Sequence, residues 1–324
     1  MTAPRSVAPI ANQQSVLSPL TDAAIFLVAT VRDEGVGAVR DLLENLSALQ
    51  RTVGFRLPAA QLSCVTGIGS QVWDRLFSGP RPAQLHPFRQ WKGPKYTAVS
   101  TPGDLLFHIR AGQMDVCFEL AAKIGEGLRG AGDIIDEVHG FKYFDERDLL
   151  GFVDGTENPS GQKAMKAVLV GDEDPDFAGG SYVMVQKYVH DLVAWNALTV
   201  EQQEAAIGRR KADNVEIPDD DKATNSHLAL NTIEDPDGNE LKILRDNMPF
   251  GSVAAGEFGT YYIAYAKTPD VPERMLRQMF LGDPYGNYDR ILDFSTAKTG
   301  SLYFAPNADF LDDLPDPPVS VSAS

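Results

Sequence analysis

Hydrophobic residues in the first half of the chain fall into short apolar runs that alternate with helical stripes. Residues 23–31 form a run of strand-favouring residues, and residues 36–49 carry Val and Leu on one helical stripe. Further strands are predicted at 62–69, 105–112 and 134–144, and a helix with a Gly-rich stop at 114–130. This β-α-β-β-α-β order predicts a ferredoxin-like unit, in which two helices cover one face of an antiparallel sheet.

The second half of the chain repeats this pattern. Strands are predicted at 181–191, 241–250 and 259–268, and helices at 199–211 and 271–282. The helix from residue 199 opens with Thr199 and Gln202, which have the spacing of a capping box. Corresponding elements of the two halves are separated by nearly the same number of residues. This holds for the first strands, which start at Ala23 and Ser181, and for the strand-turn-helix units at Leu105 and Tyr261. We therefore predict an α+β protein made of a duplicated ferredoxin-like fold, two four-stranded antiparallel sheets with peripheral helices, with coincidence as the alternative.

Composition divides the chain into four segments. We predict an N-terminal half at 1–145, a connecting segment at 146–180, a C-terminal half at 181–305 and a flexible tail at 306–324. The connecting segment is rich in Gly, Asp and Pro and is long for a connection without regular structure, which indicates a functional loop or disorder. The tail is acidic and Pro-rich, which favours mobility.

Charge and cysteine usage limit the partners and the compartment. The 324 residues carry a formal net charge of −16, which argues against a nucleic-acid surface and leaves neutral or cationic small molecules. Cys64 and Cys117 lie in apolar stretches and fit buried, reduced thiols. The first twenty residues lack the features of an export signal, and the run at 23–31 is too short to span a membrane. We predict a cytoplasmic protein without membrane or nucleic-acid partners.

The stretch GFVDGTENP at 151–159 raises the question of what Asp154 does. Asp-Gly and Asn-Pro are turn dipeptides, so the ordinary interpretation is an Asp that bonds its own turn. The apolar residues Leu150, Phe152 and Val153 would nevertheless draw this turn inward. A carboxylate removed from water is costly and tends to mark functional sites. Both interpretations stay open on the residues alone.

The acidic residues and histidines of the chain do not have the spacing of known calcium or zinc ligands. Residues 234–240 place Gly238 wrongly for a calcium loop and are better explained as a hairpin turn. No paired zinc spacing occurs among the five histidines, which are His86, His108, His139, His190 and His227. His227 lies where polar residues meet a small apolar run, and Arg245 and Asn247 follow an apolar strand. A structural histidine and a solvated ion pair are the plain alternatives for His227 and Arg245.

Taken together, GFVDGTENP, the later His227 and the segment RDNMPF at 245–250 resemble, in order and spacing, the B-type dye-decolorizing peroxidases. The GxxDG element of that family is Gly151, Asp154 and Gly155, and the resemblance covers essentially the whole chain. It implies a duplicated ferredoxin-like fold of the dimeric α+β barrel type. It also implies one heme b per chain, bound in the C-terminal half.

The resemblance assigns roles to individual residues. His227 matches the proximal ligand of the heme iron. Asp154 and Arg245 match the distal pair, with Asn247 beside them. The other ring N–H of His227 would donate to Asp289, with Asp293 as the alternative acceptor. A heme propionate would pair with Arg209, whose guanidinium suits a carboxylate.

The resemblance further implies that hydrogen peroxide oxidises the heme to a ferryl porphyrin radical, which then oxidises dyes, phenols or other bulky one-electron donors. Asp154 would move the proton and Arg245 would stabilise the developing charge, with their relative weight left open. Because an Asp ordinarily ionises near pH 4, activity is expected to be best in acid. Surface relays for electrons are candidates among Tyr182, Tyr188, Trp195, Tyr261, Tyr262 and Tyr303.

Weaker hypotheses concern cations, assembly and competing functions. Glu157, Glu216 and Glu240 are candidates for a manganese or other cation site, with solvated surface acids as the alternative. A homo-oligomer is expected. Two further functions remain open: a heme-handling protein that releases iron, and a non-catalytic encapsulin cargo. The C-terminus PPVSVSAS lacks a Gly-Ser-Leu type docking motif, which argues against encapsulation.

Overall fold

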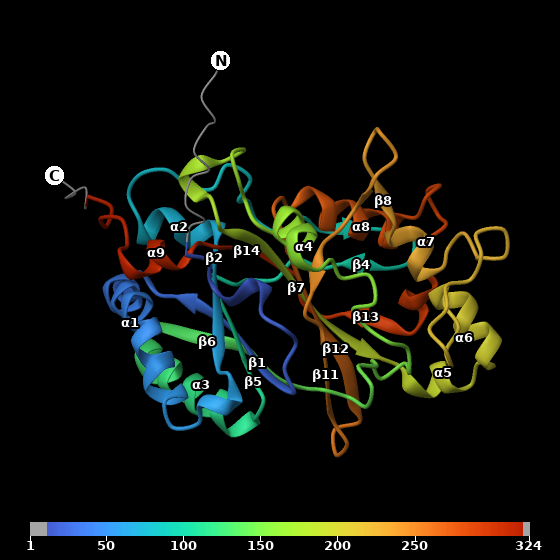
Figure 1. Ribbon diagram of the computed structural model, residues 1–324, viewed down its shortest axis with the longest axis horizontal. Helices are drawn as coiled ribbons and strands as arrows, with labels where there is room; N and C mark the ends of the chain where they lie inside the picture. The colour runs from blue at the N-terminus through green and yellow to red at the C-terminus, as the bar shows by residue number, and fades with distance from the viewer. Residues whose placement is uncertain (1–11, 320–324) are drawn as a thin grey trace.

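The strands of the two halves join in one antiparallel sheet (Figure 1). The computed structural model describes residues 12–319. Its N-terminal strands are β1 (Ala23–Val31), β2 (Ser63–Gly69), β5 (Leu105–Ala111) and β6 (Gly132–Phe141). The C-terminal strands are β7 (Ser181–His190), β10 (Leu244–Arg245), β11 (Met248–Ser252), β12 (Glu257–Ala266), β13 (Ser295–Ala297) and β14 (Ser301–Ala305). Within the described residues the order is β10-β12-β7-β14-β2-β5-β1-β6, with β11 beside β12 and β13 beside β7.

The N-terminal half has the strand order β2-β5-β1-β6 of a ferredoxin-like unit. The helices α1 (Val36–Gly54) and α3 (Met114–Leu128) cover one face of these strands. Strand β1 is buried on both faces: Ile25 and Leu27 pack toward the helices, and Phe26 packs into the opposite cluster. This alternation follows from the period of two along a strand. The short helix α2 (Ser70–Leu76) follows β2 directly.

The C-terminal half repeats the order as β11-β12-β7-β14, and α8 (Asp270–Leu281) covers its outer face. Its first helical connection is split into α5 (Leu192–Asn196), α6 (Val200–Ile207) and α7 (His227–Asn231). The predicted capping box of Thr199 and Gln202 is present at the start of α6. Two short pairs lie outside the main sheet, β3 (Trp91–Lys92) with β4 (Thr97–Ala98) and β8 (Ile233–Glu234) with β9 (Glu240–Leu241). The second pair is the predicted hairpin at 234–240.

The strand predicted at 241–250 is interrupted between β10 and β11. The main-chain N–H of Asp246 still donates to the carbonyl of Ile263 at 3.1 Å. The return bond is different, because the Ile263 N–H donates to the side-chain Oδ1 of Asn247 at 3.1 Å. The ladder therefore breaks where a side chain replaces a main-chain acceptor, and Arg245 lies at the end of β10.

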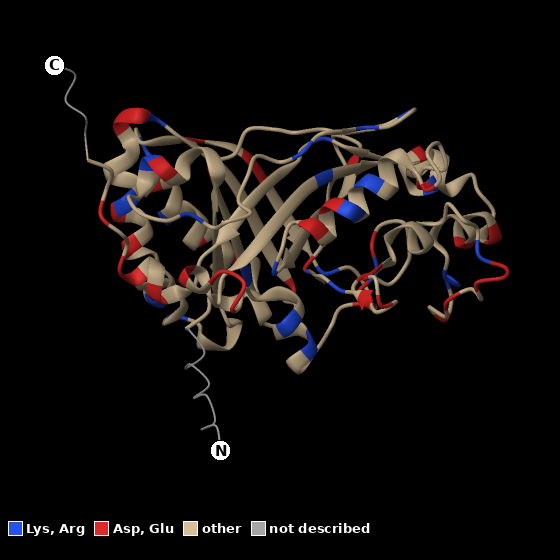
Figure 2. Ribbon diagram, turned by 90° about the horizontal axis from the view of Figure 1, so that it is seen from above, with Lys and Arg blue, Asp and Glu red and all other residues tan. Residues whose placement is uncertain are grey.

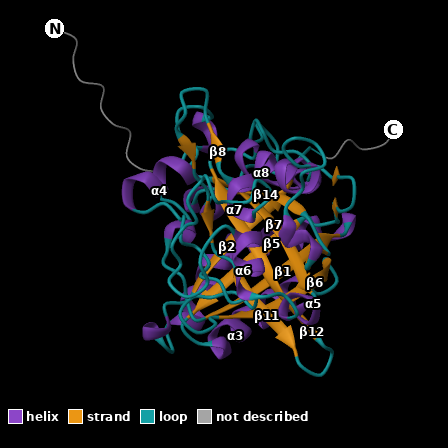
Figure 3. Ribbon diagram, turned by 90° about the vertical axis from the view of Figure 1, so that its right-hand side faces the viewer, coloured by secondary structure: helices purple, strands orange, loops and turns teal. Residues whose placement is uncertain are grey.

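Edge pairing of β14 with β2 makes the two predicted sheets continuous, through Tyr303 opposite Gly69 and Phe304 opposite Ile68. The inner faces of the two halves pack against each other, with the rings of Phe26 and Tyr261 stacked at 4.1 Å. Hydrogen bonds between the described residues do not close the sheet into a barrel. The duplicated ferredoxin-like fold is thus confirmed, with one sheet in place of two. Figure 3 shows the strands at the centre, surrounded by helices and loops.

A buried ion pair connects the halves. Arg110 on β5 and Asp246 are 1% and 3% exposed, and their side chains form a salt bridge. Asp246 lies between Arg245 and Asn247 in the sequence. Because an unpaired charge in this interior would be very costly, the pair holds the break between β10 and β11 against the N-terminal half.

The predicted connecting segment contains α4 (Gly161–Val168). Within the predicted tail, α9 (Ala308–Asp312) buries Leu311 in the core that contains α1. Asp312 also accepts a hydrogen bond from Ser47 at 3.0 Å. Residues 320–324 of that prediction lie outside the described residues.

Ionised side chains and thiols divide between surface and core. Figure 2 shows Lys, Arg, Asp and Glu mostly on the outer helices and loops. Cys64 and Cys117 are free and buried, as predicted, and burial raises the pKa of each thiol to about 12. Between residues 12 and 319, no helix is both long and apolar enough to cross a membrane.

Candidate active site

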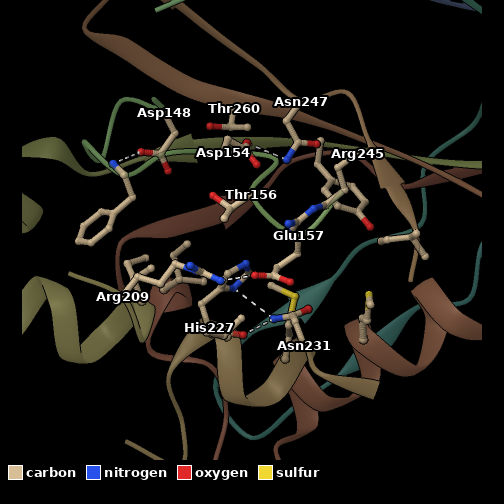
Figure 4. Close-up of a pocket in the computed structure, with 18 of the residues that line it drawn as sticks. Asp148, Asp154, Thr156, Glu157, Arg209, His227, Asn231, Arg245, Asn247 and Thr260 are labelled. Atoms are coloured by element: carbon tan, nitrogen blue, oxygen red, sulfur yellow. Dashed lines mark hydrogen bonds and ion pairs between the residues drawn. The ribbon is translucent and has the colours of Figure 1, made fainter. Parts of the chain in front are cut away.

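A deep cavity lies in the C-terminal half between strands β7 and β12, helices α7 and α8, and the loop that carries GFVDGTENP (Figure 4). Together with its open mouth it encloses about 1370 Å³ of empty space. Its apolar walls are formed by Leu150, Phe152, Ile207, Leu228, Ile243, Met275, Leu276, Met279 and Ile291. Polar side chains converge from two opposite directions, which is the arrangement expected of a cofactor or substrate site.

His227 opens helix α7 and lines the cavity. Its Nδ1 lies 2.7 Å from Oδ2 of the fully buried Asp289. Since a carboxylate accepts, Nδ1 carries the proton and Nε2 keeps its lone pair. The side chain of Asn231 donates to the His227 carbonyl at 2.7 Å, which fixes the first turn of α7. The contact of Nδ1 with Asp289 is the outer-shell hydrogen bond that normally orients a metal-binding histidine.

Asp154, Arg245 and Asn247 line the same cavity from another side (Figure 4). The Oδ2 atom of Asp154 accepts a hydrogen bond from Nδ2 of Asn247 at 2.9 Å. Asn158 bonds both main-chain groups of Arg245, donating to its carbonyl at 2.7 Å and accepting from its N–H at 2.9 Å. The loop and the end of β10 are thereby held together, and the side chains of Asp154 and Asn247 are fixed against each other.

The GFVDGTENP loop is also a turn. Gly151 and Gly155 have φ values of 91° and 76°, in the left-handed region that favours glycine. The Gly155 N–H donates to Oδ1 of Asp154 at 2.7 Å, and the Asp154 N–H donates to the carbonyl of Glu146 at 2.8 Å. Both sequence interpretations of Asp154 therefore apply: one carboxylate oxygen bonds the turn and the other is held by Asn247.

A smaller hollow of about 490 Å³ lies behind these three residues. Asp154, Arg245 and Asn247 line it as well as the large cavity. Its outer wall comes from Leu20, Thr21, Lys142, Tyr143, Glu146, Arg147, Gly155, Met248 and Pro249. The three residues thus form a thin wall between two spaces.

Arg209 lines the cavity, and its guanidinium is already paired. It forms a salt bridge with Glu157 and lies 3.6 Å from Glu216. The position predicted for a propionate partner is therefore at the cavity wall, with carboxylates of the protein as its present partners.

The glutamates of the predicted cation site, Glu157, Glu216 and Glu240, are paired with basic side chains. Among residues 12–319, no three His, Cys, Asp or Glu side chains are arranged to hold a metal ion. Lys242 pairs with Glu157 at 2.8 Å and with Glu240 at 2.5 Å, while Lys222 pairs with Glu216. Basic side chains already occupy the positions that a cation would take.

Other sequence candidates lie elsewhere. Asp293, the alternative acceptor for His227, instead bonds Lys95, Tyr96 and Tyr288. Among the aromatic candidates, Tyr188 and Tyr262 line the cavity. The others pack in core clusters and are Tyr182, Trp195, Tyr261 and Tyr303.

Two titratable cavity residues were missed by the sequence reasoning. Asp148 accepts the Phe152 N–H at 2.9 Å, and burial, with the nearby Asp154 charge, raises its pKa to about 7. His190 bonds Ser295 at 2.8 Å and Thr260 at 3.0 Å, and burial lowers its pKa to about 4. Asp148 immediately precedes the apolar pair that leads into GFVDG, a signal that would have drawn attention to it.

Comparison with known proteins matches most of the chain to one family. Residues 13–142 match the family model described as Dyp-type peroxidase, N-terminal, and residues 145–310 match Dyp-type peroxidase, C-terminal. A dye-decolorizing peroxidase of Rhodococcus erythropolis is 63% identical over 305 residues, covering 94% of this chain and 89% of the relative. One of Mycobacterium tuberculosis is 60% identical over 310 residues, covering 96% and 92%.

Solved structures agree with these matches. An encapsulated DyP-type peroxidase from Mycobacterium smegmatis superposes with a TM-score of 0.93 at 63% identity, covering 95% of this chain and all of that one. DypB from Rhodococcus jostii gives a TM-score of 0.91 at 56% identity, covering 96% and 100%. A variant of DypB in complex with heme gives the same score and identity over 94% and 98%.

Fold, cavity and relatives together define a peroxidase built on two ferredoxin-like halves. The chain belongs to the Dyp-type peroxidase family, which confirms the resemblance seen in its sequence, and its likeness to DypB fits the B-type group.

Proposed function

We propose that the cavity binds one heme b, with His227 as the axial ligand, and that the protein uses hydrogen peroxide to oxidise dyes, phenols and other bulky one-electron donors. One observation carries this proposal. The imidazole of His227 is oriented by a buried carboxylate, so its Nε2 is the free nitrogen, in a largely apolar cavity that also holds Asp154 and Arg245. The DypB relative is described in complex with heme.

The residues present fit such a group. The apolar walls suit a flat macrocycle, and Arg209 at the wall suits a propionate. Of the two histidines that line the cavity, His190 has both ring nitrogens bonded, to Ser295 and Thr260, whereas Nε2 of His227 is left for a metal. The described residues contain no cluster of three metal ligands. Iron at this position would therefore take most of its ligands from the porphyrin, which would supply the redox chemistry when bound.

The residues opposite His227 perform the proton chemistry in this proposal. Asp154 accepts a proton from hydrogen peroxide and returns it to the departing oxygen. The guanidinium of Arg245 stabilises the negative charge that develops there, and Asn247 holds Oδ2 of Asp154 in place. Asp154, Arg245 and Asn247 also line the smaller hollow, which supports an approach for peroxide that is separate from the mouth of the large cavity.

We further propose a cytoplasmic homo-oligomer. The free, buried thiols of Cys64 and Cys117 support a reducing compartment. Exposed apolar side chains on α3 and β6, namely Phe118, Ile134, Ile135 and Phe141, support self-association. The relative from M. smegmatis is described as encapsulated. Co-purification of this protein with a shell protein tests whether it is enclosed in the same way.

The absorption spectrum tests the heme proposal. The purified protein should show a Soret band, and His227→Ala should lose it, whereas His139→Ala, at an exposed position on β6, should keep it. Full heme occupancy and turnover in His227→Ala would sink the assignment. Iron release without peroxide, in place of dye turnover with it, would favour the heme-handling alternative.

A further inference from the structure

Two tyrosines at the surface share one carboxylate. Oδ1 of Asp293 accepts hydrogen bonds from Tyr96 at 2.7 Å and from Tyr288 at 3.1 Å. The two rings meet edge to face, with centroids 5.4 Å apart. Lys95 donates to the same oxygen at 2.7 Å and lies over both rings, 4.9 Å and 5.7 Å from their centroids. Tyr96 comes from the N-terminal half and Tyr288 from the C-terminal half, so the cluster exists only in the folded protein.

This arrangement suits one-electron oxidation of a phenol. A tyrosine that loses an electron must also lose its phenolic proton, and the proton needs an acceptor already in hydrogen-bond contact. Asp293 provides that acceptor for both rings. When Tyr288 gives up one electron, its O–H bond breaks and the proton moves to Asp293, leaving a neutral phenoxyl radical. A donor that then returns one electron lets the proton move back, and the tyrosine is restored.

The cluster is joined to the proposed heme ligand by a short path. Tyr288 is the immediate chain neighbour of Asp289, and Oδ2 of Asp289 lies 2.7 Å from Nδ1 of His227. One peptide unit, one side chain and one hydrogen bond therefore separate Tyr288 from the imidazole. Asp289 is fully buried, whereas Tyr96 and Tyr288 are half-buried at the surface.

We propose that Tyr288, together with Tyr96, is a surface oxidation site at which aromatic donors bearing negative charge deliver electrons without entering the cavity. This inference rests on the proposed function, because the oxidant is the peroxide-oxidised heme held by His227. Electrons pass from the donor to Tyr288 and through Asp289 to that centre.

Charge selects the class of donor. Arg290 lies 3.1 Å from Asp293 and is about half exposed, and Lys95 is 54% exposed, so two cations surround one carboxylate. The chain as a whole has a formal net charge of −16. A sulfonated or carboxylated aromatic donor is thus repelled by most of the surface and attracted here, where it would meet the edges of two tyrosine rings.

The test compares Tyr288→Phe and the Tyr96→Phe/Tyr288→Phe double variant with Tyr285→Phe. Tyr285 is a matched control, because it lies in the same loop, is 73% exposed and makes no hydrogen bond with the residues described. Rapid-freeze EPR after one equivalent of peroxide should show a tyrosyl radical in the wild type and in Tyr285→Phe. The signal should be lost in the double variant, with the Soret band and thermal unfolding unchanged.

Turnover of two different donors distinguishes oxidation at this surface site from oxidation in the cavity. With ABTS, a bulky anionic donor, kcat/KM should fall about tenfold in the double variant. With hydroquinone, a small neutral donor, it should stay as in the wild type. An unchanged radical signal and unchanged ABTS turnover, with hydroquinone still oxidised, would overturn this site and leave the proposed function standing. A wild type with neither a Soret band nor hydroquinone turnover would overturn both.

Discussion

The carboxylate of Asp289 lies 2.7 Å from Nδ1 of His227 and is shielded completely from solvent. Its charge increases the electron density of the imidazole, which stabilises oxidised iron. Asp289→Asn keeps the shape and removes the charge. We expect the reduction potential of the heme-loaded variant to rise and heme affinity to fall about tenfold. Spectroelectrochemistry and heme titration of the apoprotein measure these effects, and unchanged values in both would contradict them.

Substitutions in the wall opposite His227 should slow the reaction with peroxide. Asp154→Ala removes the proposed proton acceptor, so the rate of the Soret change after mixing with peroxide should fall about 100-fold or more. Asn247→Ala leaves the acceptor but frees its Oδ2 atom, so the loss should be smaller. Stopped-flow absorbance measures both rates. Asp172→Asn, at an exposed position of the connecting segment, is the control, and rates equal to the control in both variants would refute these roles.

Asp148 and His190 should affect stability in opposite directions over one pH range. The raised pKa of Asp148, about 7, keeps its proton bound in the folded state, so its contribution is present below about pH 4 and lost as pH rises through 7. The lowered pKa of His190, about 4, makes its contribution present above about pH 6.5 and lost as pH falls through 4.

Single substitutions measure how each residue makes stability depend on pH. Asp148→Asn, which preserves an acceptor for the Phe152 N–H, should gain stability relative to the wild type as pH rises from 4 to 7. His190→Gln should gain it as pH falls over the same range. Thermal unfolding against pH measures both, and parallel curves for the wild type and both variants would rule out these shifts.

Lys242 should limit cation binding near the cavity, because it pairs with both Glu157 and Glu240. Lys242→Gln removes the cation between these carboxylates. Manganese affinity, measured by EPR of the free ion, should then rise about tenfold, since hard cations prefer oxygen ligands. Lys163→Gln, at an exposed position on α4, is the control. No difference between the two variants would show that Lys242 does not exclude the ion.

The Arg110–Asp246 pair should stabilise mainly by leaving no buried charge unpaired. Arg110→Met isolates the carboxylate of Asp246 and should cost about 3 kcal/mol of unfolding free energy. Asp246→Leu added to it removes that charge and should restore much of the loss. Urea unfolding measures the cycle. A double variant less stable than Arg110→Met would show that the pair itself, and not the avoided charge, supplies the stability.

Sequence periodicity predicted most strands and helices because each buries one apolar face on a neighbour. It failed at residues 241–250, where the side chain of Asn247 replaces a main-chain acceptor and splits the strand. Acidic and Pro-rich composition also hid the contacts of the predicted tail, where Leu311 is buried and Phe310 and Leu314 pack against the same core. Such errors arise from individual long-range contacts, which local patterns do not encode.

The candidate site was predicted through its motif residues. His227, Asp154, Arg245 and Asn247 all line one cavity, and Asp289 and not Asp293 bonds His227. For the predicted cation site, composition shows the glutamates but not the lysines that the fold places beside them. Asp148 was missed because its raised pKa comes from burial, which depends on the tertiary fold.

The pairing of β14 with β2 constrains how the protein is made. Strand β2 ends at Gly69, whereas β14 begins at Ser301, so the ribosome completes nearly the whole chain before β2 gains its second neighbour. Until then the nascent N-terminal half exposes an apolar strand edge of the kind that recruits other chains. We therefore expect a chain truncated after β6 and before Ser301 to fold its N-terminal half locally and to aggregate through the open edge of β2.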